Sequence, residues 1–116
     1  MTAGNEFRGM ADRFRAAPDK AAGMVRAATT KAVVDTQRLA RERAPVDTGY
    51  LRASIFTREG AQGATWWGEV EAGAEYAAYV EHGTSRQRPQ PFMRPAHEQV
   101  KPVFVQMIEQ IGGKAL

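Results

Sequence analysis

Apolar residues recur in steps of three and four, first at Phe7, Met10 and Phe14 and again from Val25 to Ala40, and charged residues lie between them. This spacing gathers the apolar side chains into one stripe, as in an amphipathic helix. The pattern predicts a long helical segment over residues 5–44, interrupted at Pro18, because proline removes a backbone donor and clashes with the preceding turn. Ala44-Pro45 is expected to end it, since the residue before a proline is disfavoured in helical conformation.

The middle of the chain alternates between apolar and polar residues, which is the period of a half-buried strand. Leu51–Thr57 and Thr65–Ala72 both alternate in this way, and residues 59–63 between them hold two glycines that suit a loop. We therefore predict a hairpin over residues 51–72.

An irregular element and a loop are predicted over residues 74–94. Within Glu75–His82, apolar residues at helical spacing precede Gly83, which suits a helical turn closed by a glycine, with a short strand as the alternative. Thr84–Gln90 is polar and has no periodicity, so we expect an exposed, mobile loop there.

A C-terminal helix is predicted over residues 95–111. Apolar residues from Val100 to Ile111 follow the helical series, and Gly112-Gly113 is expected to stop it. Pro102 is tolerable if the helix begins near Gln99 and would bend one that begins at Pro95.

The order of these elements predicts a single α+β domain over residues 1–116. A small antiparallel sheet would pack against the long N-terminal helix and the C-terminal helix. The edges of so small a sheet favour pairing with a neighbouring subunit. Trp66 and Trp67 would point to opposite faces of the sheet, so both are candidates for subunit contacts.

Composition excludes several functional classes. The chain has no cysteine, which rules out disulfides, thiolate zinc sites and a cysteine nucleophile, and fits a reducing cytoplasm. No apolar run approaches the ~20 residues that span a bilayer, and the N-terminus lacks the apolar stretch of a secretion signal. We therefore expect a soluble protein.

The net charge of +3 is unevenly distributed. Residues 1–45 hold nine Lys or Arg against five Asp or Glu, whereas residues 46–116 hold seven against eight. A basic segment can bind nucleic acid by releasing phosphate counterions. The interspersed acids, however, favour a solvated helix face.

The sequence gives only weak signals of catalytic or metal-binding residues. Asp47-Thr48-Gly49 matches the active-site triplet of aspartic proteases, whose chemistry needs two carboxylates in an apolar pocket. Here the triplet follows a basic helix. The sequence therefore favours a structural turn at these residues. His82 and His97 lack the spacing that places two imidazoles on one helix face. We expect no catalytic residue, no metal and no cofactor.

Three blocks in order carry a resemblance to a known family, namely Ala44–Ile55, Tyr76–Thr84 and Pro91–Ala96. Together they resemble the phage neck or tail-component proteins named for gene product ten of phage HK ninety-seven, over residues 20–110. The residues that match the motifs are Asp47, Thr48, Gly49, Leu51, Tyr76, Tyr79, Glu81, Gly83, Pro91, Phe92 and Pro95.

The resemblance implies a structural virion protein of a long-tailed bacteriophage. Its members act in the neck, in head-tail joining or tail completion, as a ring coaxial with the DNA exit channel; we expect a hexamer or dodecamer. The partners implied are adjacent neck, connector or tail-tube proteins, with non-specific contact to DNA in the channel. Arg86 and Arg88 in loop 84–90 are candidates for contacts with such a neighbour. A tail terminator and, less favoured, a basic DNA-binding protein are the alternatives.

Overall fold

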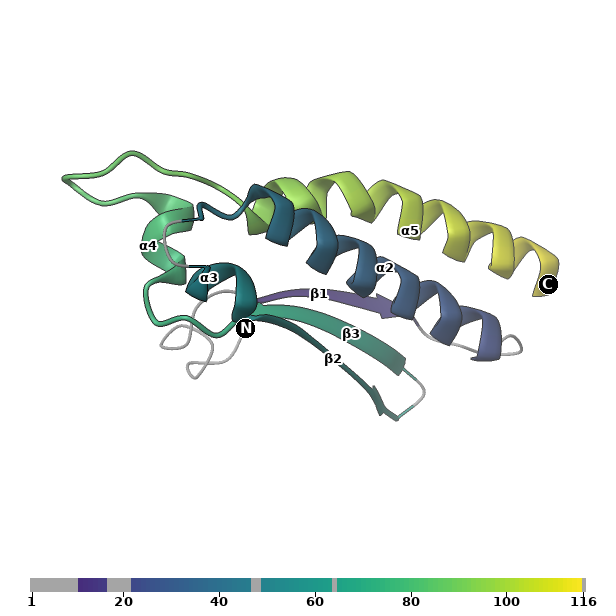
Figure 1. Ribbon diagram of the computed structural model, residues 1–116. Helices are drawn as coiled ribbons and strands as arrows, with labels where there is room; N and C mark the ends of the chain where they lie inside the picture. Colours follow the sequence, from purple (N-terminus) through teal and green to yellow (C-terminus); the bar gives the residue numbers. More distant parts are fainter. Residues whose placement is uncertain (1–10, 17–21, 47–48, 64, 116) are drawn as a thin grey trace.

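The computed structural model describes residues 11–16, 22–46, 49–63 and 65–115, and two long helices in it lie side by side on one face of a sheet (Figure 1). The elements in chain order are β1 (Ala11–Ala16), α2 (Ala22–Arg43), α3 (Tyr50–Ala53), β2 (Ile55–Gln62), β3 (Thr65–Ala72), α4 (Ala77–His82) and α5 (Met93–Ala115). Helices α2 and α5 form one layer and the sheet forms the other, which confirms the predicted α+β fold.

The sheet is antiparallel, with β3 in the centre and the strand order β1-β3-β2. β2 pairs with β3 from Ile55↔Ala72 to Gln62↔Thr65. β1 pairs with the other edge of β3. The central strand is therefore hydrogen-bonded on both sides, whereas β1 and β2 are the outer strands of the sheet that the described residues form.

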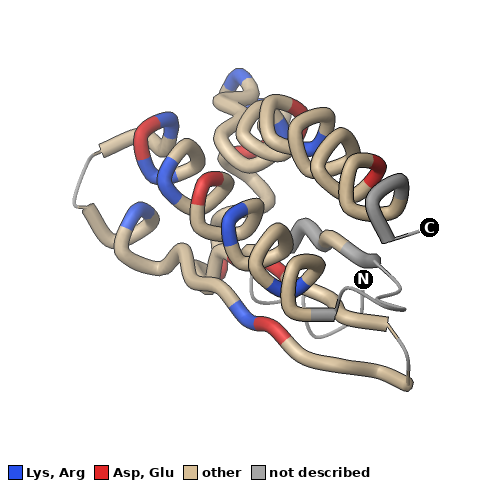
Figure 2. The backbone as a smooth tube through the Cα atoms, turned by 90° about the vertical axis from the view of Figure 1, so that its right-hand side faces the viewer, with Lys and Arg blue, Asp and Glu red and all other residues tan. Residues whose placement is uncertain are grey.

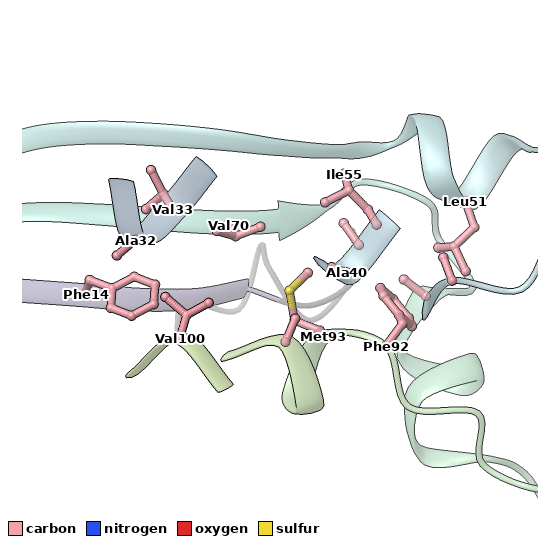
Figure 3. Packing of buried hydrophobic residues seen from close by; sticks show 14 of the residues in the cluster. Phe14, Ala32, Val33, Ala40, Leu51, Ile55, Val70, Phe92, Met93 and Val100 are labelled. Atoms are coloured by element: carbon pink, nitrogen blue, oxygen red, sulfur yellow. The ribbon is translucent and has the colours of Figure 1, made fainter. Parts of the chain in front are cut away.

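The core lies between the helix pair and the sheet (Figure 3). Val70 and Ile55 from the sheet and Val33 from α2 belong to one core cluster, and all three are fully buried. Burying a side chain of this size stabilises the fold by about 1.5–3 kcal/mol. Phe14 of β1 packs against Phe104 of α5, with ring centroids 5.0 Å apart. The core thus ties each helix to a different part of the sheet.

Gly68 lets α2 approach the central strand closely. A Cβ atom at this position would come within 2.7 Å of the Thr29 and Val33 methyl groups. Since side chains on a strand alternate between faces, Gly68, Val70 and Ala72 all face the helices. The absence of a side chain at 68 sets the spacing between the two layers.

The helical segment predicted over residues 5–44 is wrong in part, because Ala11–Ala16 form strand β1. Backbone pairing with β3 and the burial of Phe14 outweigh the helical preference of this Ala- and Arg-containing stretch. Helix α2 occupies Ala22–Arg43 of the predicted segment and ends before Pro45, as predicted. The break predicted at Pro18 lies outside the described residues.

The predicted strand Leu51–Thr57 is extended only from Ile55 onward, because its first residues belong to α3. The Ser54 N–H donates to the Tyr50 carbonyl at 3.0 Å and closes a helical turn. Leu51 and Ile55 are buried and four residues apart, a spacing that fits one turn of helix as well as it fits a strand. The sequence pattern therefore did not distinguish α3 from the start of a strand. The hairpin therefore begins at residue 55, rather than spanning 51–72.

The hairpin loop predicted over residues 59–63 is also too long. The strands stay paired as far as Gln62, and Gly63 has a φ of 60° in the turn that follows. Gly60, which suggested a loop, lies opposite Trp67, and a Cβ there would come within 2.9 Å of the indole ring. This glycine makes room for an aromatic ring within the sheet rather than turning the chain.

Helix α5 extends beyond the predicted 95–111 at both ends. It continues through Gly112-Gly113, because a glycine weakens a helix by only about 1 kcal/mol relative to alanine and does not force it to stop. Pro102 lies inside the helix. Pro95 falls in the first turn, where a missing N–H costs no intrahelical bond.

Candidate functional site

A buried carboxylate connects α4 to the beginning of α5. Glu81 is only 3% exposed. Its Oε1 atom accepts hydrogen bonds from the backbone N–H groups of Phe92 (3.0 Å) and Met93 (2.8 Å), and its Oε2 atom accepts one from Arg94 (3.0 Å). The first N–H groups of a helix have no partners inside it, and negative charge is favourable there. Glu81 is therefore the N-terminal cap of α5, supplied by another helix.

The loop between α4 and α5, residues 84–90, is exposed throughout, as predicted, and is held by hydrogen bonds at both ends. The Thr84 N–H donates to the Gln87 carbonyl at 2.9 Å, and the Gln90 N–H donates to the Val80 carbonyl of α4 at 2.8 Å. The Thr84 hydroxyl accepts hydrogen bonds from the next backbone N–H groups along the loop. These bonds give the loop a defined path from α4 to α5.

Gly83 closes α4 and receives the returning loop. Its φ of 77° and ψ of 175° lie in a region that is open essentially only to glycine. Its N–H donates to the Tyr79 carbonyl at 2.8 Å. A Cβ atom here would come within 2.7 Å of the Pro89 nitrogen. The helical turn closed by a glycine, predicted within residues 75–82, is confirmed.

Other motif residues lie in the core or beside it. Leu51 and Phe92 are both buried, near the end of the core where α3 and α4 lie (Figure 3). Pro91, just before Phe92, is exposed, and Pro95 is half-buried. The return of the loop at 91–92 thus inserts one aromatic ring into the core.

The motif turn before α3 is described in part. Gly49 has a φ of 78°, a backbone conformation that favours glycine, which fits the structural turn predicted there. Asp47 and Thr48 lie outside the described residues.

Three tyrosines are exposed at the end of the molecule formed by α3 and α4 (Figure 1). The exposed fractions are 59% for Tyr50, 40% for Tyr76 and 65% for Tyr79. The rings of Tyr50 and Tyr76 are 6.1 Å apart, within the range of interacting aromatic pairs. Tyrosine is enriched in protein interfaces because it offers a large apolar ring with a polar tip. These three residues are called the tyrosine end below.

A groove lies between the N-terminal part of α2 and the C-terminal part of α5. Its volume is about 350 Å³. The residues that line it are Met24, Ala27, Ala28, Lys31, Met107, Gln110 and Ile111. The two short alanine side chains leave space between the longer side chains of the helices. This hollow, called the helix groove below, was not predicted from the sequence.

Residues 8–83, more than half of the chain, match a protein family described as "Bacteriophage HK97-gp10, putative tail-component". The chain belongs to this family. No curated protein and no solved structure matches it. As an HK97-gp10-like tail component it has a structural role in the phage virion and contacts other phage structural proteins. The match contains the first motif block and the second as far as Gly83, and it ends before Pro91–Ala96, so the third block rests on the sequence resemblance.

The two tryptophans of this HK97-gp10-like chain lie on opposite faces of β3, as predicted. The Arg26 guanidinium of α2 lies 4.3 Å from the Trp66 ring centroid, and Trp67 lies against Gly60 on the other face. Both tryptophans are half-buried within the subunit. Their role in subunit contacts stays a prediction.

Arg86 and Arg88, the other predicted contact residues, are exposed in the loop. Within the part of the chain that the structure describes, neither makes a salt bridge. Both guanidinium groups are thus available to carboxylates or phosphates outside the subunit.

A buried ionic cluster in the sheet was missed by the sequence analysis. Glu69 and Glu71 are each 1% exposed on the face of β3 that points away from the helices. Arg58 of β2 contacts them at 2.7 and 3.4 Å. The hydrogen bond to Glu69 raises the pKa of Arg58. The sequence carries only a weak signal for this cluster, namely alternate acids in one predicted strand and an arginine in the strand before it. That signal does not identify an ion pair unless the register between the two strands is known.

The histidines that were considered as metal ligands lie on separate helices. His82 is at the end of α4, whereas His97 of α5 packs against Phe14 with ring centroids 4.9 Å apart. The described residues contain no group of His, Asp and Glu placed to hold a metal. None of the helices in these residues is long and apolar enough to cross a membrane.

Proposed function

We propose that this chain is a non-catalytic subunit that forms a ring in the phage neck and acts in head-tail joining. One observation carries the proposal. In this chain of a tail-component family, the second motif block, Tyr76–Thr84, builds an exposed end of the molecule. Glu81 and Gly83 fix loop 84–90, while Tyr76 and Tyr79 are exposed beside it. A motif that builds one exposed end, rather than a cleft with reactive groups, fits an assembly protein.

In this proposal the subunit forms a hexamer or dodecamer around the DNA channel and contacts neck, connector or tail-tube proteins. The small sheet supports self-association, because among the described residues each of its two outer strands pairs on one side only, with β3. A tail terminator is the second candidate within the same class. It differs in which neighbouring ring it touches, and the same exposed end would serve either role.

The charges of α2 favour this function over DNA binding. Lys31 pairs with Asp35 at 2.7 Å and Arg38 pairs with Glu42 at 3.2 Å, so cations and acids alternate along the face of α2 that carries these two pairs (Figure 2). A polyanion that follows this face would meet a carboxylate about every second turn of the helix.

Size-exclusion chromatography with light scattering tests the proposal, with and without the purified connector and tail-tube proteins. We expect a closed oligomer, or a monomer that forms a ring only on one of these partners. A small species that ignores both partners, and whose affinity for duplex DNA falls steeply with salt, would replace the proposal with the DNA-binding alternative.

A further inference from the structure

We propose that copies of this chain associate head to tail, with the tyrosine end of one copy entering the helix groove of the next. The inference rests on the proposed function, because it names the two surfaces through which the ring would close.

The two surfaces lie at opposite ends of an elongated molecule. Its longest dimension is 52 Å, against 24 and 22 Å for the others. Helices α3 and α4 occupy one end, while the start of α2 and the last turns of α5 reach the other (Figure 1). Two different surfaces placed in this way cannot meet within one chain. Between copies they form a heterologous contact, which gives a ring when the rotation closes.

The groove has the chemistry to hold a tyrosine ring. Met24 is 51% exposed, and Met107 and Ile111 line the opposite wall. Methionine is adaptable in shape, and its sulfur makes favourable contacts with aromatic rings. The Gln110 amide at the groove can hydrogen-bond to a phenol hydroxyl. An apolar floor with a polar group thus matches a side chain that has an apolar ring and a polar tip.

The size of the contact predicts weak pairs that become stable in a closed ring. A tyrosine buries about 150–250 Å², so the exposed parts of Tyr50, Tyr76 and Tyr79 amount to about 300 Å². A standard interface buries about 800 Å² on each partner, so loop 84–90 and the rim of the groove must contribute as well. Each copy in a closed ring makes two such contacts, whereas a pair makes one.

Cross-linking between engineered cysteines tests the arrangement directly, because the chain has no cysteine of its own. Glu75→Cys beside the tyrosine end is combined with Met24→Cys in the groove; both sites are exposed. The matched control combines Glu75→Cys with Gln62→Cys, which is also exposed and lies on the sheet. Each pair is treated with a short bismaleimide, and native mass spectrometry follows the oligomer separately. Tyr79→Ala is examined in the same assay, with Tyr79→Phe as its conservative variant.

We expect a ladder of covalent multimers from the 75/24 pair and at least tenfold less from the 75/62 pair. Tyr79→Ala should reduce the ladder, and Tyr79→Phe should largely retain it. An oligomer that forms without the 75/24 ladder, or that is unaffected by Tyr79→Ala, overturns this inference and leaves the ring proposal standing. Failure to self-associate in all conditions, including with the connector and tail-tube proteins, overturns both.

Discussion

Replacing Glu81 by alanine removes the cap of α5 and is expected to destabilise the fold strongly. The substitution deletes the acceptor of hydrogen bonds from Phe92, Met93 and Arg94 at 2.8–3.0 Å. Phe92 and Met93 are fully buried, so their N–H groups cannot easily bond to water instead. Arg94 is exposed, and its N–H group can be hydrated in the variant.

The magnitude follows from the two buried donors. A buried donor left without a partner costs about 1–3 kcal/mol, and loss of an ordinary single-bond helix cap costs about 0.5–2 kcal/mol. The variant also avoids the desolvation of a buried carboxylate, which offsets part of this loss. We expect the free energy of unfolding to fall by about 3 kcal/mol, a large part of the ~5–15 kcal/mol typical of a domain.

Urea unfolding followed by circular dichroism measures the change, as a lower midpoint at unchanged slope. Glu81→Gln should lose less, because its amide keeps one acceptor oxygen. Glu98→Ala is the control, since Glu98 is an exposed acid on α5, the helix that Glu81 caps, and should change stability by no more than about 0.5 kcal/mol. A Glu81→Ala variant as stable as the Glu98→Ala variant would refute the cap.

Three further substitutions test other parts of the structure. Gly83→Ala should lower the free energy of unfolding, measured in urea, by at least about 2 kcal/mol, because the backbone conformation of Gly83 and the Pro89 nitrogen at 2.7 Å both exclude a Cβ atom. An unchanged urea midpoint would contradict this. Gly68→Ala should lower the free energy of unfolding by about 1–3 kcal/mol, measured by thermal unfolding, because the new Cβ atom would push α2 away from the sheet. An unchanged stability would mean that α2 and the sheet are not in close contact at this position. The double change Arg86→Ser with Arg88→Ser should alter stability by no more than about 0.5 kcal/mol, yet reduce the yield of joined particles in an assembly assay. Normal joining by this variant would remove the two arginines from the proposed contact.

The long helices were predictable because their apolar residues follow a helical period over several turns. The turn closed by Gly83 was also predictable, since a glycine after a short helical run is a local signal. These features depend on residues that are near one another in the sequence.

Features that depend on distant residues were missed. Strand β1 exists because β3 offers its free edge, and Gly60 faces Trp67 only in the observed register. Glu81 caps a helix that begins beyond an intervening loop, so its role was hidden although the motif contained it. The sequence identified the residues of the exposed end, but not which of them support it and which face outward.

Electron cryo-microscopy of joined phage particles tests the central claim most directly. The proposal predicts a closed ring of this subunit at the junction of head and tail, coaxial with the DNA channel, with six or twelve copies. Absence of the subunit from the joined particle, or its location away from that junction, would contradict the account.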